Sequence, residues 1–276
     1  MSETPSRFIE GSPRLHYLEW NPQGAQTIVL LHGNSANAWW WQPTASEMRG
    51  ADLRMIALDL RGHGDSGWVR PPAYAPADYA KDIVRLIEAL RLARPIVIGH
   101  SMGGIATLAF AEHHRDLSRA AIAIDVAISS GPRRNRYLRH LKSLPTVHYR
   151  DLETARARFR LMPNEGGIAP EILSAVAEHS VARGEDGRYS MNFDRESFFG
   201  SDGMDVAESI RRIEIPLLLV RAGLSRIMTE EAAAAAAASN RMARLVTIPD
   251  THHHVLLERP ELLAAVIREF IATLPQ

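Results

Sequence analysis

Gly99-His100-Ser101-Met102-Gly103-Gly104 is the stretch of sequence that decides the fold. It follows a compact apolar segment, Pro95–Ile98, and precedes a segment, Gly104–His113, whose composition favours a helix. In a sharp strand-to-helix turn, glycines two residues on either side of a serine remove Cβ atoms that would otherwise collide. Such a turn points the serine Oγ out of the sheet and aims the following backbone N–H groups at a developing oxyanion. The alternative is an ordinary glycine-rich turn.

Apolar runs of strand length alternate with helical periodicity on both sides of this turn. The predicted strands are Arg7–Glu10, Leu15–Trp20, Thr27–Leu31, Leu53–Leu60, Pro95–Ile98, Ala120–Ile128, Pro216–Val220 and Ala243–Ile248. The predicted helices are Pro76–Leu90, Gly104–His113, Glu230–Ser239 and Glu261–Leu274. Strands buried on both faces that alternate with helices indicate an α/β fold, with a mainly parallel central sheet flanked by helices.

In the middle of the chain, strands no longer alternate with helices. Residues 130–205 are rich in arginine and are interrupted at Pro145, Pro163 and Gly166-Gly167, without a second complete set of strands. We therefore expect an inserted helical cap at 130–205, with 1–129 and 206–276 forming one core. Aromatic residues near its end predict an apolar underside over a small or medium hydrophobic substrate. These are Tyr189, Phe193, Phe198 and Phe199. The arginines either attract an anionic substrate or form the solvated face of helices.

Three motifs resemble those of the α/β-hydrolase superfamily, in the same order along nearly the whole chain. They are the turn His32-Gly33-Asn34, the loop Asp59-Leu60-Arg61-Gly62-His63-Gly64-Asp65-Ser66 and the Gly-His-Ser-Met-Gly-Gly elbow. The resemblance implies a serine hydrolase, esterase-like, with an oxyanion hole made by the backbone N–H groups of Asn34 and Met102. It implies a structural role for the 59–66 loop. Ser101 in place of an aspartate disfavours the dehalogenase and epoxide-hydrolase branches.

A serine hydroxyl needs a base to become a nucleophile at neutral pH. Three histidines, His252, His253 and His254, follow the last predicted strand, where the superfamily places its catalytic histidine. The spacing to Pro260, seven residues in the family pattern, selects His253. If the segment is extended, the two neighbouring rings point away from the site. A metal site is a weaker interpretation, because adjacent ligands on one loop rarely give tetrahedral geometry.

The acid departs from the family pattern. Its usual place, the turn after Pro216–Val220, holds Ser225 and Arg226 instead of a carboxylate. A recognised variation puts the acid at the end of the preceding central strand, where Asp125 stands. Asp125 is our candidate, although an aspartate there also occurs as a structural residue. Glu230 and Glu231 lie farther into a helix and are poorer candidates.

These residues predict a Ser101–His253–Asp125 acyl-enzyme mechanism acting on a carboxylic ester, thioester or lactone. The missing standard acid leaves a second class open: a non-catalytic or weakly catalytic ligand-binding protein with the same fold. Carbon–carbon bond hydrolysis and perhydrolysis use the same machinery and stay open too. Trp39, Trp40 and His100 are candidate pocket residues. The alternative for the tryptophans is that they anchor the loop against the core.

The amino-acid composition excludes several classes of binding partner. The 276 residues carry 32 basic and 32 acidic side chains, and this balance disfavours a nucleic-acid binder. Without cysteine there is no thiolate metal site and no cysteine nucleophile. No targeting peptide or membrane-length apolar run is visible, so we expect a cytoplasmic protein. We expect a small-molecule substrate, no cofactor, no metal, no membrane partner, and a homodimer as an open alternative.

Overall fold

The computed structural model describes residues 6–50, 52–129, 131–198 and 204–275, the side chains of 132–134 excepted. Eight strands form one sheet in the order β1-β2-β4-β3-β5-β6-β9-β10. Their bounds are β1 Ser6–Ile9, β2 Leu15–Trp20, β3 Gln26–Leu31, β4 Leu53–Leu58, β5 Ile96–His100, β6 Ala120–Ile124, β9 Leu217–Ala222 and β10 Ala243–Ile248. β1 and β2 pair antiparallel, β2 also pairs antiparallel with β4, and the six strands from β4 to β10 are parallel.

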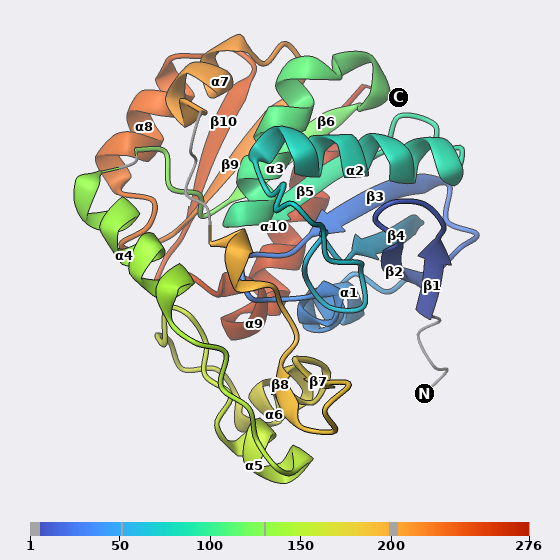
Figure 1. Cartoon of the computed structure of the whole chain (residues 1–276). Helices are drawn as coiled ribbons and strands as arrows, with labels where there is room; N and C mark the ends of the chain where they lie inside the picture. Colours follow the sequence, from blue (N-terminus) through green and yellow to red (C-terminus); the bar gives the residue numbers. More distant parts are fainter. Residues whose placement is uncertain (1–5, 51, 130, 199–203, 276) are drawn as a thin grey trace.

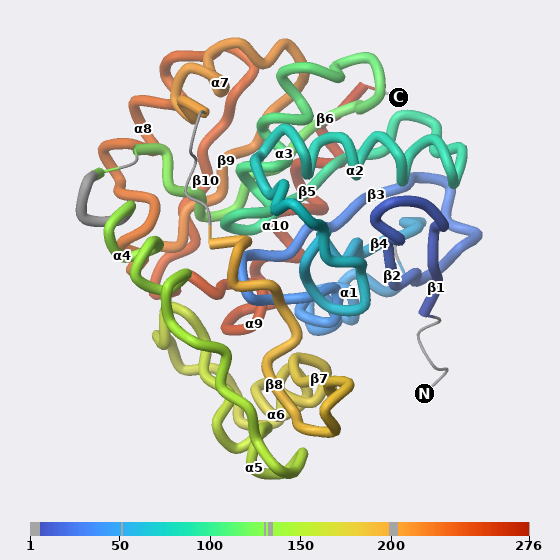
Figure 2. Tube along the Cα trace, in the orientation of Figure 1, coloured from blue at the N-terminus to red at the C-terminus, as the bar shows by residue number. Residues whose placement is uncertain are grey.

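Helices cover both faces of this sheet (Figures 1 and 2). They are α1 Gln42–Glu47, α2 Pro76–Ala89, α3 Met102–His113, α7 Val206–Arg212, α8 Glu230–Ala238, α9 Val255–Glu258 and α10 Pro260–Ala272. Alternate residues of β6 and β9 pack in separate apolar clusters, one with α3, α7 and α8 and the other with α1, α9 and α10. The predicted α/β-hydrolase architecture, a mainly parallel sheet flanked by helices, is confirmed.

Some predicted bounds need correction at the carboxyl edge of the sheet. β6 ends at Ile124 rather than at Ile128, because Asp125 has a positive φ of 47° and turns the chain out of the sheet. α3 begins at Met102 rather than at Gly104, directly after Ser101. Both differences bring polar side chains to the ends of adjacent parallel strands, where α/β folds place their sites.

The described part of the segment between β6 and α7 contains three α-helices, a small hairpin and a 3₁₀ helix at Arg195–Ser197. The α-helices and the hairpin are α4 Pro132–Ser143, α5 Leu152–Ala157, α6 Pro170–His179, and the antiparallel pair β7 Val181–Arg183 and β8 Tyr189–Met191. We call residues 131–198 the insertion. It extends away from the sheet in Figures 1 and 2. The hairpin was not predicted. Each of its strands has only three residues, too short for a clear alternating pattern. Phe199 of the predicted apolar underside lies outside the described residues.

Short contacts join the insertion to the core beside the 3₁₀ helix η1, Ala38–Trp41. The ring of Trp39 stacks on His179 at the end of α6, with centroids 3.8 Å apart. Trp40 is buried, and its Nε1–H donates to Ser180 Oγ at 3.4 Å. Thus the tryptophans fix α6 against the core, which favours the anchoring alternative.

The loop that follows β4 is organised by a buried carboxylate. Asp59 Oδ1 accepts the backbone N–H of Ala38 at 2.6 Å, and Oδ2 accepts that of Asp65 at 2.9 Å. Oδ2 also lies 2.6 Å from His16 Nδ1, on the neighbouring strand β2. A Cβ on Gly64, whose φ is +53°, would lie 2.1 Å from Oδ2, so no other residue fits there. All these contacts are structural ones.

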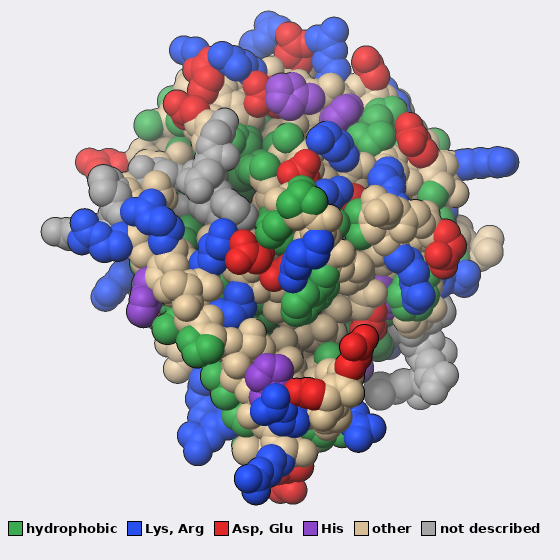
Figure 3. Space-filling view, viewed as in Figure 1, with side chains coloured by type: hydrophobic (Ala, Val, Ile, Leu, Met, Phe, Trp, Pro, Cys, Tyr) green, Lys and Arg blue, Asp and Glu red, His purple; other side chains and the backbone are tan. Residues whose placement is uncertain are grey.

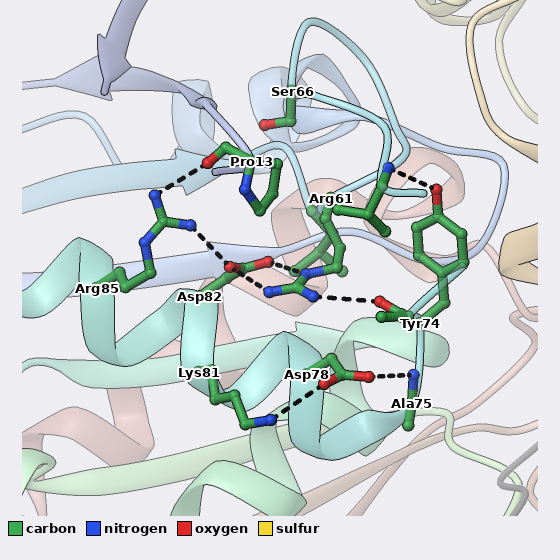
Figure 4. A network of polar contacts seen from close by, with 12 residues as sticks. Pro13, Arg61, Ser66, Tyr74, Ala75, Asp78, Lys81, Asp82 and Arg85 are labelled. Atoms are coloured by element: carbon green, nitrogen blue, oxygen red, sulfur yellow. Dashed lines mark hydrogen bonds and ion pairs between the residues drawn. The ribbon is translucent and has the colours of Figure 1, made fainter. Parts of the chain in front are cut away.

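Arg61 of the same loop forms a second buried anchor (Figure 4). Its Nε and Nη2 donate to Asp82 of α2 at 2.6 and 2.8 Å, and its Nη1 donates to the carbonyl of Ala73 at 3.2 Å. The Asp82 carboxylate is fully buried, and the Arg61 side chain is 10% exposed. This bidentate pair therefore fastens α2 to the carboxyl edge of the sheet.

No helix in the described residues combines the length and the apolar character needed to cross a membrane.

Arg61→Gln is expected to lower the free energy of unfolding by about 3 kcal/mol, because it leaves the buried Asp82 carboxylate without its main cation. Urea denaturation followed by circular dichroism measures the loss. Lys81→Gln is the control: Lys81 is 69% exposed and pairs with Asp78 on the same helix, so its loss should cost less than about 0.5 kcal/mol. Equal effects of the two changes would contradict the role given to Arg61.

Candidate active site

Ser101 stands at the turn between β5 and α3 in a strained conformation, with φ 53° and ψ −117°. Glycines permit this turn. A Cβ on Gly99 would lie 2.1 Å from the carbonyl oxygen of Gly103, and a Cβ on Gly103 would lie 2.4 Å from that of His32. Neither distance is compatible with a larger residue, so the backbone of the elbow packs directly on itself and on β3. The strain holds the Ser101 side chain at the edge of the sheet.

His253 lies in the turn between β10 and α9 and is 3% exposed. Its Nε2 lies 3.0 Å from Ser101 Oγ, and its Nδ1 lies 2.7 Å from Asp125 Oδ2. The carboxylate accepts a hydrogen bond from Nδ1–H, so the neutral ring presents Nε2 as an acceptor for the serine hydroxyl. The structure thus brings the three predicted residues into one continuous hydrogen-bonded chain.

Asp125 follows β6 and is fully buried. Its Oδ1 accepts the backbone N–H of Ala222, at the end of β9, at 3.1 Å. Its Oδ2 accepts a short hydrogen bond from the hydroxyl of Ser225. Burial raises the pKa of Asp125 to about 6, although the bonds from Ser225 and Ala222 favour the charged form. The carboxylate is ionised at pH 7 and becomes neutral in mild acid.

Ser225 is a site residue that sequence reasoning did not identify. It stands in the turn after β9, the place where the resemblance expects the acid, and it was considered there only as a missing carboxylate. Its hydroxyl donates to Asp125, and it also accepts the backbone N–H of Ile227 at 3.0 Å. Two features of the sequence together indicate such a contact: a short polar side chain in that turn, and an aspartate at the end of the neighbouring strand β6.

The other two histidines of the triplet do not both point away from the site. Nδ1 of His252 lies at hydrogen-bond distance, 3.0 Å, from Glu258 Oε1. His254, however, is buried with its ring centroid 5.0 Å from that of His253, and its Nε2–H donates to the carbonyl of Pro163 at 2.9 Å. The expectation was wrong for His254 because residues 253–254 form a turn rather than an extended segment. Burial lowers the pKa of His254 to about 3, so the ring is neutral.

His100, a candidate pocket residue, holds the backbone of His253 in place through a hydrogen bond. It is 1% exposed, and its Nε2–H donates to the backbone carbonyl of His253 at 2.8 Å. Burial, together with the neighbouring His253 and His254, holds the pKa of His100 well below its usual range. A neutral ring in this position adds no positive charge beside the base.

Asn34 and Met102 flank the serine. Met102 is the first residue of α3, so its N–H has no acceptor within the helix. β3 is parallel to β5, with Leu31 paired to Gly99, and the turn after β3 therefore lies beside the elbow. A Cβ on Gly33 would lie 3.3 Å from the Ser101 Cβ, which puts the adjacent Asn34 next to the nucleophile. The Asn34 side chain donates to the carbonyl of Ser197 at 3.0 Å.

A cavity of about 160 Å³ opens above Ser101 and is lined mainly by apolar and aromatic side chains. The lining comprises Asn34, Ser35, Tyr74, Pro76, Tyr79, Ser101, Met102, Ile105, Tyr137, Leu138, Leu141, Met162, Pro163, Phe198, Ile227 and His253. Its walls come from α2 and α3 of the core and from α4 and the 162–163 turn of the insertion. Trp39, Trp40 and His100 are not among these residues: Trp40 and His100 are buried, and the partly exposed Trp39 stacks on His179. This corrects their assignment to the pocket.

Two groups in the described residues bring metal-ligating atoms within 4.8 Å of one another: His100 with His253 and His254, and His16 with Asp59 and Asp65. In the first group, both ring nitrogens of His253 are hydrogen-bonded, while His100 and His254 each use Nε2 and have a buried Nδ1 without a partner among the described residues. In the second, the Asp59 carboxylate holds the loop after β4.

The site can therefore carry out acid–base chemistry on a bound carbonyl compound. The hydroxyl proton of Ser101 can pass to His253 Nε2, and the buried carboxylate of Asp125 can stabilise the resulting imidazolium. The two backbone N–H groups beside Ser101 are suited to an anionic oxygen. These parts come from four separate loops at one edge of the sheet.

The chain is similar to known proteins over nearly its whole length. Residues 28–266 match a family described as the alpha/beta hydrolase family. An uncharacterized hydrolase of Bacillus subtilis, YugF, is 26% identical over 96% of this chain and 97% of that protein. A pimeloyl-[acyl-carrier protein] methyl ester esterase of Neisseria meningitidis is 25% identical over 91% and 94%. A crystal structure of E-2-(acetamidomethylene)succinate hydrolase is 25% identical, with a TM-score of 0.83 over 98% and 100% of the two chains.

Since the family match spans residues 28–266 and the similar proteins are hydrolases aligned over nearly their full lengths, this chain belongs to the alpha/beta hydrolase family and is a hydrolase.

Proposed function

We propose that the protein cleaves a carboxylic ester, thioester or lactone through a covalent acyl-enzyme formed on Ser101. The observation that carries this proposal is the chain of hydrogen bonds from Asp125 through His253 to Ser101, with distances of 2.7 and 3.0 Å. It ends in a cavity large enough for a small acyl or alcohol group. The relative named as a methyl ester esterase supports an ester bond as the target.

In the first step Ser101 Oγ attacks the substrate carbonyl carbon while His253 Nε2 takes the hydroxyl proton. Negative charge collects on the carbonyl oxygen, where the N–H groups of Asn34 and Met102 stabilise it. His253 then gives the proton to the leaving alcohol or thiol as the tetrahedral intermediate collapses. Water, activated by the same ring, attacks the acyl-enzyme, and the acid is released.

Asp125 holds the His253 ring in the productive tautomer and balances its positive charge. An aspartate from the end of β6 does the work that the family pattern assigns to a residue after β9. Ser225, from the latter position, acts through Asp125 and is a positioning residue. Its hydroxyl lowers the pKa of the buried carboxyl toward the charged form that the mechanism needs.

We propose that the insertion, within the expected range 130–205, serves as the cap over the cavity, with residues 1–129 and 206–276 as the core. α4 supplies three lining residues, Tyr137, Leu138 and Leu141. The described lining contains His253 but no lysine, arginine, aspartate or glutamate. The apolar remainder favours an uncharged alkyl or aryl group next to the reacting carbonyl.

A ligand-binding protein without catalysis is the second class of function. It would not need a buried carboxylate aligned with a histidine and a strained serine, since each of these lowers stability. Carbon–carbon bond hydrolysis and perhydrolysis would use the same residues on other substrates. Hydrolysis of an acyl ester is the reading that the apolar cavity and the ester-cleaving relative favour together.

We expect a fluorophosphonate probe to label the protein at Ser101, because His253 activates that hydroxyl for attack on phosphorus. Mass spectrometry of the intact protein measures the added mass. The matched control is Ser239→Ala, at the exposed end of α8, which keeps the nucleophile, while Ser101→Ala should abolish labelling. Equal labelling of Ser101→Ala and the wild type would refute Ser101 as the nucleophile, and no labelling at all would favour the binding protein.

Asp125→Asn should lower kcat by about four orders of magnitude on a short acyl ester, since the amide no longer balances the imidazolium and favours the wrong tautomer. Steady-state kinetics with a chromogenic ester provide the measurement. Glu230→Gln, at the exposed start of α8, is the control and should change kcat less than twofold. Small and similar losses in the two variants would show that Asp125 is not the acid.

Activity should fall as the pH decreases through about 6, because Asp125 takes up a proton there and loses the charge that stabilises the His253 imidazolium. Ser225→Ala removes a donor that favours the ionised carboxyl, so the pKa of Asp125 rises and the acidic limb moves to higher pH. Profiles of log kcat against pH measure the displacement. Ser225→Thr keeps a hydroxyl and should restore the wild-type limb. A limb that stays in place in Ser225→Ala would contradict this role.

A further inference from the structure

A second cavity, of about 190 Å³, lies beside the cavity that contains Ser101. The two share Ser35 and Met162 in their linings and are therefore adjacent. Apolar rings of Phe159 and Phe193 form part of the second cavity. Three arginines also line it, Arg158, Arg160 and Arg195, all from the insertion. A substrate held at Ser101 could extend past Met162 toward these three cations.

The three guanidinium groups have no carboxylate within 4 Å among the residues that the structure describes. Arg160 donates to the carbonyls of Ala157 and Phe159, at 2.9 and 2.6 Å, and Arg195 donates to that of Leu141. Backbone carbonyls satisfy donors but do not neutralise charge. Arg195 also has its Nε buried without an acceptor in the described chain. Burial without a counter-charge lowers its pKa.

The acids nearest to Arg195 in sequence are engaged elsewhere. Asp194 accepts hydrogen bonds from Arg70 and Tyr74, and Glu196 pairs with Lys142 at 2.8 Å. Arg156 differs from these arginines in having an acidic partner. It lies on α5, near Arg158 in sequence, and pairs with Glu178 at 3.1 Å. The structure therefore provides an acid for Arg156 and leaves the arginines at the second cavity without one.

The stretch of chain that contains Arg158 and Arg160 has the same sign. Residues 131–160 contain nine arginines and lysines but only two acids, Asp151 and Glu153, in a chain whose total charge is balanced. Lys and Arg side chains gather at the lower end of the molecule, around α5, with a few acidic ones among them (Figure 3). A local excess of positive charge beside a cavity attracts anions and raises their concentration there.

We propose that Arg158, Arg160 and Arg195 bind an anionic group of the substrate, a carboxylate or a phosphate, while its ester carbonyl lies at Ser101. This inference rests on the proposed function and names its substrate class: an ester or thioester with an apolar segment and a remote anion. Guanidinium forks suit both anions, since each offers two oxygens to paired N–H donors. Phe159 and Phe193 would pack against the apolar segment.

Matched pairs of esters test the proposal and locate the anion. Methyl pentanoate and monomethyl glutarate differ by a carboxylate on the acyl side, and propyl butyrate and 3-(butyryloxy)propyl phosphate differ by a phosphate on the alcohol side. In at least one pair, kcat/KM for the anionic ester should exceed that for the neutral ester about tenfold at low ionic strength. The ratio should shrink in 0.5 M salt, because salt screens these partly exposed charges.

Arg158→Gln/Arg160→Gln and Arg195→Gln should each lower this ratio about threefold to tenfold, chiefly through KM. Arg156→Gln is the matched control on α5 and should leave the ratio unchanged. Because the ratio compares two substrates on one preparation, a partly unfolded variant does not distort it. A ratio near one in both pairs, or a ratio that the arginine variants leave unaltered, would overturn the proposal.

Binding to Ser101→Ala separates this inference from the proposed function. Calorimetry should show that Ser101→Ala binds the favoured anionic ester about tenfold more tightly than its neutral partner, and that adding Arg158→Gln/Arg160→Gln removes the difference. Arginine-dependent binding without any Ser101-dependent hydrolysis would support the anion site and contradict the esterase. Hydrolysis of the neutral esters without an anionic preference in either measurement would support the esterase and sink the anion site.

Discussion

The site of this protein depends on one buried carboxylate. Asp125 lies at the end of the central strand β6, away from solvent, and a charge in that place persists only when hydrogen bonds replace its lost hydration. Donors reach it from Ala222, Ser225 and His253. Ala222 is the last residue of β9, Ser225 lies in the turn that follows it, and His253 lies in the turn after β10. The carboxylate thereby holds three loops together at one edge of the sheet.

The order of the strands makes this convergence possible. β5, β6 and β9 are adjacent and parallel, so their carboxyl ends place the serine, the aspartate and the supporting hydroxyl side by side. Close packing of Gly99 against Gly103 fixes the height of the serine above the sheet. The buried anchors of Asp59 and Arg61 secure the loop after β4 and α2, whose tyrosines form one wall of the cavity. Stability and site geometry are thus supplied by the same contacts.

The insertion contributes two kinds of side chain to the surroundings of the site. Close to the serine it contributes apolar side chains from α4, and farther away it contributes arginines without partner acids in the described chain. An apolar wall next to the reacting carbonyl raises the strength of the electrostatic interactions there by excluding water. Exposed cations at a distance draw in a charged group without placing a charge beside His253. An apolar environment for the carbonyl and a binding site for an anion are compatible because separate segments of the insertion supply them.

The sequence by itself determined the architecture and the parts of the site that are local in the chain. Strand–turn–helix glycines specify the Ser101 elbow, since a Cβ at Gly99 or Gly103 cannot be accommodated, and apolar runs specify the buried parallel strands. It also put forward Asp125 and His253. Only the tertiary structure decided which groups meet. The bond from Ser225 to Asp125 joins residues 100 positions apart, and the turn that brings His254 beside His253 replaces an expected extended segment. The lining of both cavities was likewise beyond sequence reasoning, because packing of the insertion against the core depends on contacts that no local pattern encodes.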